Sequence, residues 1–239
     1  SGGGAAFASS NIQFVDSTLT SNSSIDDGGG IAIGGGSTVS IATTEISNNS
    51  SGDFGGGLYI TGASLFLIDS TISGNSAAAS GGGLNNEQSA ITIRRSTFSN
   101  NSAAVSGGAI DNFQGTIGVS QTTISGNTAG SAGGGIVNFA GGAIELQSST
   151  IVDNSAGDLG GGLWNAGIAR AGTTIIAQNS GANGSADVNG AVTSLGANLV
   201  GDGAGSNGII GGVGGNLVGT TNNPIDPGLT PLQDNGGPT

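Results

Sequence analysis

The chain has 239 residues, with 51 glycines, no cysteine and a formal net charge of −12 at pH 7. The length allows a substantial core, the clustered glycines exclude collagen, and recurring apolar residues with 8% charged residues exclude a disordered chain. The negative charge argues against nucleic acid and anionic membrane surfaces as partners, and no apolar run reaches the roughly 18 residues of a membrane helix.

A repeat of about 26 residues starts at the second residue and continues to residue 181. Each copy joins a glycine cluster to an Ile/Thr segment that ends in asparagine, as in GGGLYITGASLFLIDSTISGN at residues 55–75. The apolar residues that follow the glycines are separated by 27, 26, 26, 26 and 27 residues, and they are Ile31, Leu58, Leu84, Ile110, Ile136 and Leu163. Such a period is typical of a solenoid, in which each unit packs on its neighbours.

Each repeat is predicted to contain three short strands, which in the copy above are residues 57–60, 64–68 and 70–73. Apolar residues alternate within them, so one face of each strand is buried. A second apolar column is predicted to point inward, formed by Leu19, Ile46, Ile72, Phe98, Ile124, Ile151 and Ile175. The pattern predicts an all-β, single-stranded parallel β-helix with about seven to nine coils. A leucine-rich repeat has a similar period, but the return segment SAAASGGGL at residues 76–84 suits a glycine turn better than a helix.

An asparagine column is predicted to form an internal ladder of side-chain amides, with its two ends left exposed. Each amide would bond to the backbone and to the asparagine of the next coil, because a buried amide without a partner costs roughly 1–3 kcal/mol. The N-x-[ST] sequons at two of its positions are interpreted as by-products of the ladder. The column is Asn22, Asn49, Asn75, Asn101, Asn127, Asn154 and Asn179.

A threonine column lies beside the second apolar column and is predicted to face outward. With the serines two positions on, it would form a flat hydroxyl face, interrupted by Glu45 and then by Val152 and Ile176. This face is a candidate for contact between rods or, less favoured, for ice binding. The column is Thr18, Thr71, Thr97, Thr123, Thr150 and Thr174.

Acidic residues before the glycine triplets are candidates for a Ca²⁺ site. Asp26, Asp27, Asp53 and Asp158 occupy this loop in different coils, and hard cations prefer carboxylate oxygens. Turn chemistry alone also places aspartate there. No other cofactor is predicted. The segment 211–219 matches a Ca²⁺-binding nonapeptide except for Asn216 at the ligand position, and it is interpreted as a glycine-rich turn.

The chain contains three basic residues, Arg94, Arg95 and Arg170, which limits any lyase-like site. Asp69 lies one coil before Arg95 and is expected one position off in register, so a surface salt bridge is the favoured interpretation. A hydrolase-like site needs two close carboxylates, and no convergent set is evident. No catalytic residue is therefore predicted.

Two aromatic residues, Tyr59 and Trp164, hold equivalent outward positions in their coils. An outward Trp can stack on a sugar ring, but packing beneath a loop is the favoured interpretation.

Residues 182–239 are predicted to form irregular glycine-rich coils and a tail of the same domain as residues 1–181. The chain resembles the right-handed β-helix surface proteins of bacteria, including the polymorphic outer-membrane proteins, whose repeats carry GGA[ILV] and FxxN. Residues 107–110 spell the first motif, and Phe98, Asn100 and Asn101 approximate the second. The stretch 194–239 resembles the segment that follows such repeats in large extracellular proteins. The resemblance implies a right-handed coil and an extracellular or cell-surface location.

The leading hypothesis is a non-catalytic surface structural or adhesive module without membrane insertion. The repeat starts at Gly2, without a starting Met, a signal peptide or a cap, so open coil ends are expected to pair head to tail into filaments. A host surface or a glycan is the other expected partner. The alternative is a β-helix that binds or degrades polysaccharides, and ice binding is a third possibility.

Overall fold

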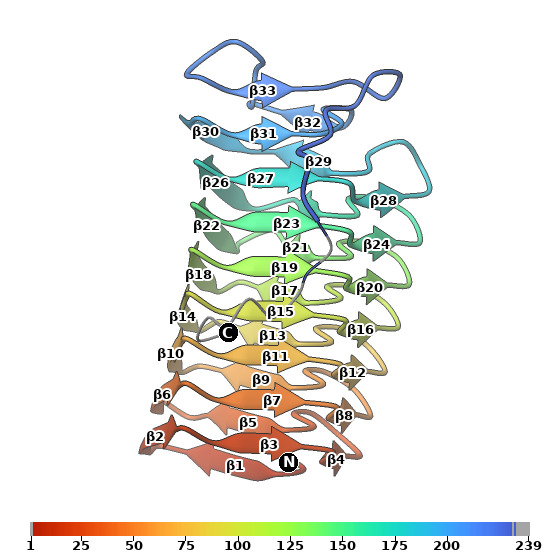
Figure 1. Cartoon of the computed structure of the whole chain (residues 1–239). Helices are drawn as coiled ribbons and strands as arrows, with labels where there is room; N and C mark the ends of the chain where they lie inside the picture. Colours follow the sequence, from red (N-terminus) through yellow and green to blue (C-terminus); the bar gives the residue numbers. More distant parts are fainter. Residues whose placement is uncertain (1, 231, 233–239) are drawn as a thin grey trace.

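The computed structural model describes residues 2–230 and 232, and these form strands and no helix. The chain winds as a right-handed parallel β-helix of about eight turns with about 26 residues in each, which confirms the predicted fold (Figure 1). The described residues contain no helix that is long and apolar enough to cross a membrane.

Each regular coil contains four strands rather than the three predicted. The third coil shows all of them: β9 (Leu58–Thr61), β10 (Ser64–Ile68), β11 (Thr71–Ser73) and β12 (Ser76–Ala77). The fourth strand has two residues, so it is too short to show apolar alternation. Four parallel sheets result, here named A to D in chain order.

Sheets A and B contain the first two strands of each coil, except that the last coil has no strand in sheet B. Sheet A comprises β1 (Ala5–Ala8), β5 (Ile31–Gly34), β9, β13 (Leu84–Glu87), β17 (Ile110–Phe113), β21 (Ile136–Asn138), β25 (Leu163–Asn165), β29 (Val188–Ala191) and β32 (Ser206–Asn207). Sheet B comprises β2 (Asn11–Val15), β6 (Thr38–Ala42), β10, β14 (Ala90–Arg94), β18 (Thr116–Ser120), β22 (Ala143–Gln147), β26 (Ile168–Gly172) and β30 (Thr193–Gly196).

Sheets C and D contain the last two strands. Sheet C comprises β3 (Thr18–Thr20), β7 (Glu45–Ser47), β11, β15 (Thr97–Ser99), β19 (Thr123–Ser125), β23 (Thr150–Val152), β27 (Ile175–Ala177), β31 (Leu199–Val200) and β33 (Leu217–Val218). Sheet D comprises β4 (Ser23–Ser24), β8 (Ser50–Ser51), β12, β16 (Ser102–Ala103), β20 (Thr128–Ala129), β24 (Ser155–Ala156) and β28 (Ser180–Gly181).

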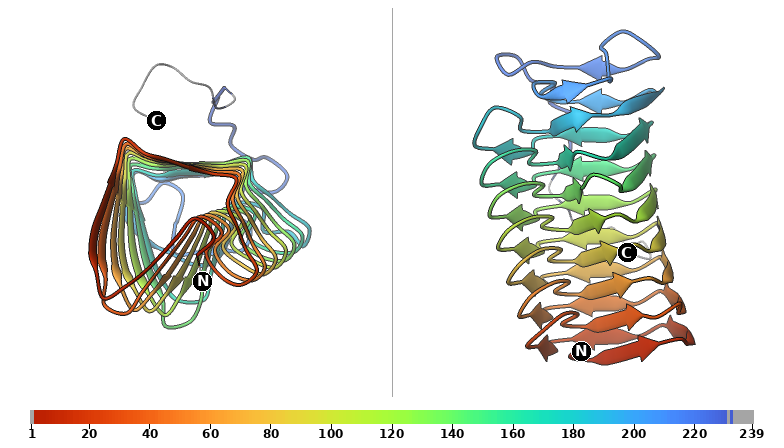
Figure 2. Two further views of the ribbon diagram at one scale, coloured as in Figure 1. Left: turned by 90° about the horizontal axis from the view of Figure 1, so that it is seen from below. Right: turned by 180° about the vertical axis from the view of Figure 1, so that it is seen from behind.

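Sheets A, B and C enclose the apolar core, while sheet D forms a lobe to one side (Figure 2). Inward residues stack in register, so that Leu65 pairs with Ile91 and Ile72 with Phe98. Phe98 is the largest of the fully buried side chains. The two inward columns identified by periodicity therefore form the core, as predicted, except that Ile175 is not a member of the second column.

The predicted register is wrong by one residue after Ile151. Ile151 pairs with Ile176, and Thr150 pairs with Ile175. This coil is shortened, so Ile176 is buried at 1% exposure and Ile175 takes the place assigned to Thr174. The asparagine spacing of 25 residues at the same point follows the true register.

The glycine triplets form the close-packed turn between the lobe and sheet A. Gly55 has φ of 65°, a conformation that L side chains rarely adopt. A Cβ on Gly56 would lie 2.5 Å from the backbone carbonyls of Ser76 and Gly82. The stacked turn therefore excludes side chains.

The coils become irregular toward the C-terminal part. Sheet D ends at β28, and the register between β26 and β30 shifts at Ala171 and Gly172. After β33 the described chain runs back across the front of sheet C, where Gln178 Nε2 donates to Asp226 Oδ1 at 3.1 Å (Figure 1). The predicted boundary at residue 181 stays a prediction.

Candidate functional site

The predicted asparagine column forms a continuous ladder at the corner between sheets C and D. From Asn22 to Asn179, each Nδ2 donates to Oδ1 of the next asparagine at 2.8–3.0 Å. Asn49 is 1% exposed, which supports the interpretation of its sequon as a by-product of the ladder. The column therefore stabilises the rod and does not form a binding site.

The ladder is closed at one end, contrary to the expectation that both ends are exposed. Asp187 Oδ1 accepts hydrogen bonds from the backbone N and from Nδ2 of Asn179, at 3.0 and 2.8 Å. Burial raises the pKa of the Asp187 carboxyl, and these hydrogen bonds oppose that rise. A carboxylate thus replaces the next asparagine in the irregular coil.

A second asparagine ladder, absent from the predictions, lies on sheet A. Asn86, Asn112 and Asn138 each donate from Nδ2 to Oδ1 of the next asparagine at 2.7–2.8 Å, and Asn165 is the last member. Their spacing of 26, 26 and 27 residues is the sequence feature from which this ladder could have been predicted. The preceding coil has Ile60 at this register, and Asn86 Oδ1 is buried without a hydrogen-bond partner.

The candidate Ca²⁺ ligands do not converge. Asp53 N donates to the Asp26 carbonyl oxygen at 3.3 Å, which places these two in adjacent coils. Asp158 lies four coils beyond Asp53, with Ala79, Val105 and Ser131 in between. Asp27 Oδ1 accepts from the backbone N of Phe54, and the Asp158 carboxylate accepts from Asn183 Nδ2. The described residues contain no group of three or more acidic side chains that could hold a metal ion.

The predicted threonine column is present on sheet C, but its side chains are less exposed than expected. Thr71, Thr97, Thr123 and Thr150 stack in register on sheet C, and Thr18 is separated from them by Glu45. Thr174 is not a member: it is 1% exposed and lies at the corner between sheets B and C, where its Oγ1 donates to the Gly172 carbonyl. Three serines of the neighbouring row, Ser47, Ser99 and Ser125, are also buried. The geometry does not favour a flat hydroxyl surface.

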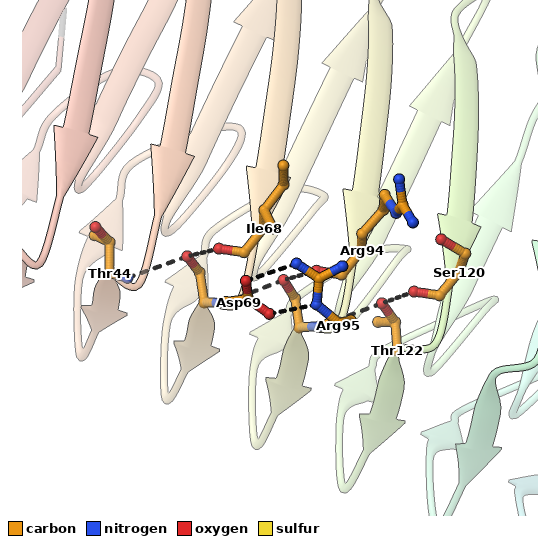
Figure 3. A network of polar contacts seen from close by, with 9 residues as sticks. Thr44, Ile68, Asp69, Arg94, Arg95, Ser120 and Thr122 are labelled. Carbon is orange, nitrogen blue, oxygen red and sulfur yellow. Dashed lines mark hydrogen bonds and ion pairs between the residues drawn. The ribbon is translucent and has the colours of Figure 1, made fainter. Parts of the chain in front are cut away.

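Arg95 forms the predicted salt bridge with Asp69. Its Nε and Nη2 donate to the two carboxylate oxygens at 2.7 Å each (Figure 3). The residues occupy equivalent corner positions, because Ile68 pairs with Arg94; the expected offset of one position is therefore wrong. The hydrogen bonds from Arg95 lower the pKa of Asp69. Arg94 points away from this ion pair (Figure 3).

A groove of about 530 Å³ lies on the outer face of sheet B. We call it the sheet B groove; residues that line it include Thr92, Gly118, Ser120, Glu145, Ile168 and Arg170. It exists because Gly118 has no side chain, and a Cβ built there would meet no atom within 4 Å. A glycine inside an alternating strand was the available signal, since such glycines often mark a close approach to a ligand or backbone.

The outward Trp164 packs against the ring of Phe139 in the turn after β21, which agrees with the favoured packing interpretation. Its ring centroid lies 5.5 Å from that of Phe139, which lies 6.2 Å from Phe113, both in edge-to-face geometry. The tilted rings do not form one flat stacking platform. Tyr59, also half-buried, donates its hydroxyl to Glu87 Oε2 at 2.8 Å.

A buried carboxyl group lies beneath the lobe on the outer side of sheet A. Asp111 is 2% exposed, and its Oδ2 accepts from Ser106 Oγ at 2.9 Å. Burial raises the pKa of Asp111 to about 7, the Ser106 hydrogen bond opposes this, and the nearby Glu87 adds to it. Its register neighbour Asn85 has a buried Oδ1 without a partner.

Comparison with known proteins identifies the architecture. Residues 3–183 match a protein family described as "Right handed beta helix region". Searches of curated proteins and of solved structures found no match.

Proposed function

The chain belongs to the right-handed β-helix family, and on this premise we propose that it is a non-catalytic extracellular module that binds a cell surface or a polysaccharide. The family contains both structural or adhesive proteins and polysaccharide-degrading enzymes. The choice between them therefore depends on the side chains that this rod presents.

The sheet B groove is the observation that carries the proposal. Glu145 is the one carboxylate among the residues that line it. Glycoside hydrolysis generally uses two carboxyl groups on either side of the scissile bond. One carboxylate among hydroxyl and guanidinium groups favours binding over cleavage.

The rigidity of the rod supports the same function. The two asparagine ladders satisfy buried amides in successive coils, and each hydrogen bond contributes about 1 kcal/mol net. A binding surface on such a scaffold loses little conformational entropy when a ligand arrives. An extended face suits adhesion, in which many weak contacts act together.

The test combines binding with product analysis. The protein is incubated with immobilised polysaccharides of several charge classes, and retention is measured together with release of new reducing ends and unsaturated sugars. Retention without product supports the proposal. Degradation is the second candidate, favoured by Glu145 and Arg170 being register partners in one groove, and catalytic release of product that Glu145→Gln abolishes would establish it.

We further propose that the protein is extracellular and that its rods assemble end to end. Assembly requires strands of one copy to pair with the terminal strands of another. Electron microscopy and light scattering at rising protein concentration distinguish filaments from single rods. Fractionation of the producing cell tests the location.

A further inference from the structure

We propose that a hollow on the outer face of sheet A binds an organic ammonium group, with the Asp27 carboxylate and the Tyr59 ring as its contacts. The hollow has a volume of about 310 Å³ and lies over the first three strands of the sheet, β1, β5 and β9 (Figure 1). We call it the sheet A hollow. The inference is independent of the sheet B groove and of polysaccharide binding.

Small outward residues form the floor of the sheet A hollow. Ala6 of β1 pairs with Ala32 of β5, and two residues further along the same strands Ala8 pairs with Gly34. All four line the hollow. Because none of them has a side chain larger than a methyl group, the face of the sheet is depressed over these two coils.

Two larger residues of β9 form the wall of the sheet A hollow toward the next coil. Tyr59 is the register partner of Ala32, and a Cβ built on Gly34 would lie 3.4 Å from Cγ2 of Thr61. The Tyr59 hydroxyl donates to Glu87 Oε2 at 2.8 Å. This hydrogen bond fixes the aromatic ring as part of the lining.

Asp27 places a negative charge at the edge of the sheet A hollow. It lines the hollow from the turn before the glycine triplet of its coil. Its Oδ1 accepts from the backbone N of Phe54 at 3.2 Å, which orients the carboxylate and leaves the second oxygen for a ligand. The one ion pair among the described residues is Arg95–Asp69, so no arginine in that part of the chain neutralises Asp27.

The surrounding charges favour a positively charged ligand. The first 93 residues contain seven acidic residues and no basic residue. Burial, the hydrogen bond and charge of Glu87, and then the charge of Asp27 raise the pKa of Tyr59, so its phenol stays neutral. A neutral aromatic ring also attracts a cation placed over its face.

The lining favours an organic ammonium group over a metal ion. Of the nine residues that line the sheet A hollow, three carry a side-chain oxygen: Asp27, Tyr59 and Thr61. Calcium usually takes six to eight oxygen ligands, which this set does not supply. The apolar floor instead suits the carbon body of an amine, while the Asp27 carboxylate accepts hydrogen bonds from its ammonium group.

A sugar fits the sheet A hollow less well. Each sugar hydroxyl group that loses water on binding needs a hydrogen-bond partner. The alanine and glycine floor offers no side-chain partner, and the Tyr59 hydroxyl already donates to Glu87. The required ammonium group is carried both by free small amines and by the lysine side chain of a partner protein.

The experiment follows the ring signals of Tyr59 by NMR in the full chain labelled with ¹³C-tyrosine. Tyr59 is the one tyrosine of the chain, so these signals report on the sheet A hollow. Benzylamine, benzyl alcohol and benzoate share one ring and are positive, neutral and negative near pH 7. Benzylamine should bind at least tenfold more tightly than benzyl alcohol, a difference of about 1.4 kcal/mol, and benzoate should not bind.

A peptide probe, Ala-Ala-Lys-Ala-Ala, distinguishes the two sources of the ammonium group. Binding of this peptide more tightly than benzylamine would assign the hollow to a lysine side chain of a partner. Weaker binding of the peptide would assign it to a free amine. Absence of binding by both probes would overturn the proposal and leave the proposed polysaccharide adhesion intact.

Three variants test the residues and the space. Asp27→Asn keeps an acceptor for the backbone N of Phe54 but removes the charge, and it should weaken benzylamine binding tenfold or more. Ala8→Phe fills the hollow at an exposed position without changing charge, so it should fold, which its melting temperature checks, and should lose benzylamine binding. Asp153→Asn removes an exposed carboxylate outside the hollow and should bind within about twofold of wild type. Equal affinity for benzyl alcohol, unchanged binding in both hollow variants, or an equal loss in Asp153→Asn would overturn the assignment.

Discussion

Asn179 donates from Nδ2 to Asp187 Oδ1 at 2.8 Å, so that a buried carboxylate ends the asparagine ladder. The other oxygen, Asp187 Oδ2, accepts from the backbone N of Asp202 at 2.6 Å. Asp187 therefore joins the regular coils to the irregular coil that follows. Its Oδ1 accepts the hydrogen bonds of Asn179, just as the Oδ1 of each ladder asparagine accepts those of the asparagine one coil earlier.

Replacing Asp187 with leucine should destabilise the rod. The change leaves the backbone N–H groups of Asn179 and Asp202 without these acceptors, and each buried unsatisfied group costs roughly 1–3 kcal/mol. Urea unfolding followed by circular dichroism measures the loss. Asp226→Asn changes an exposed carboxylate and should stay within about 0.5 kcal/mol of wild type. Equal stability of Asp187→Leu and wild type would show that the ladder needs no closing acceptor.

The second ladder predicts that replacing its end residue and replacing a middle residue will lower the stability of the rod by different amounts. Asn86→Leu removes one inter-asparagine bond and transfers the unpartnered oxygen from Asn86 to Asn112. Asn112→Leu removes two such bonds and leaves both Asn86 Oδ1 and Asn138 Oδ1 without a donor. The middle variant should therefore be less stable by roughly 1–3 kcal/mol.

Urea midpoints of the two variants check this prediction, because the substitutions are chemically identical and both sites are fully buried. A larger loss for Asn86→Leu would mean that cavity and packing effects exceed the hydrogen-bond difference.

The sequence was sufficient to predict the features that recur in every coil. The first ladder was predictable because asparagine returns in seven consecutive repeats, and the apolar columns drift with it. The second ladder occupies four coils and is preceded by Ile60, so no uniform column marked it. The two-residue strands of sheet D are below the length at which alternation can be detected.

The sequence analysis also made one register error, caused by a change in repeat spacing, and missed one groove, which is defined by an absent side chain. One shortened coil shifted Thr174 and Ile175 by one residue, a change that reverses inward and outward positions in a strand. The sheet B groove depends on the absence of a side chain at Gly118 between neighbours in other coils. Such a hollow is defined only when the register of adjacent strands is known.

Substitution by alanine should have opposite effects on stability at Gly56 and at Gly118. A Cβ at Gly56 would lie 2.5 Å from backbone atoms of two neighbouring segments, so the turn must move. We expect a loss of about 3 kcal/mol, at the upper end for overpacking. A Cβ at Gly118 meets no atom within 4 Å, and alanine there should raise stability by roughly 0.5–1 kcal/mol. Thermal unfolding of both variants measures the contrast, and a tolerated Gly56→Ala would contradict the close-packed turn.

Asp111 should make stability depend on pH. Its folded-state pKa of about 7 exceeds the ordinary value of 3.8, so the folded state binds the proton more tightly than the unfolded chain. The stabilising contribution of the neutral acid is complete below about pH 3.8 and is lost as pH rises toward 7. The difference of about three pKa units corresponds to up to about 4 kcal/mol.

Asp111→Asn is the matched variant, because its amide stays neutral, keeps an acceptor for Ser106 Oγ and always carries a donor. Comparison with wild type is needed because Asp69 and Asp187 also have shifted pKa values, lowered and raised respectively. The free energy of unfolding, measured in urea from pH 4 to pH 8, should fall in wild type relative to Asp111→Asn. Parallel curves would show that Asp111 has the same proton affinity in the folded and unfolded chain. A wild-type curve that rises relative to the variant would show an ionised Asp111 stabilised by an unseen cation, which added chelator would then remove.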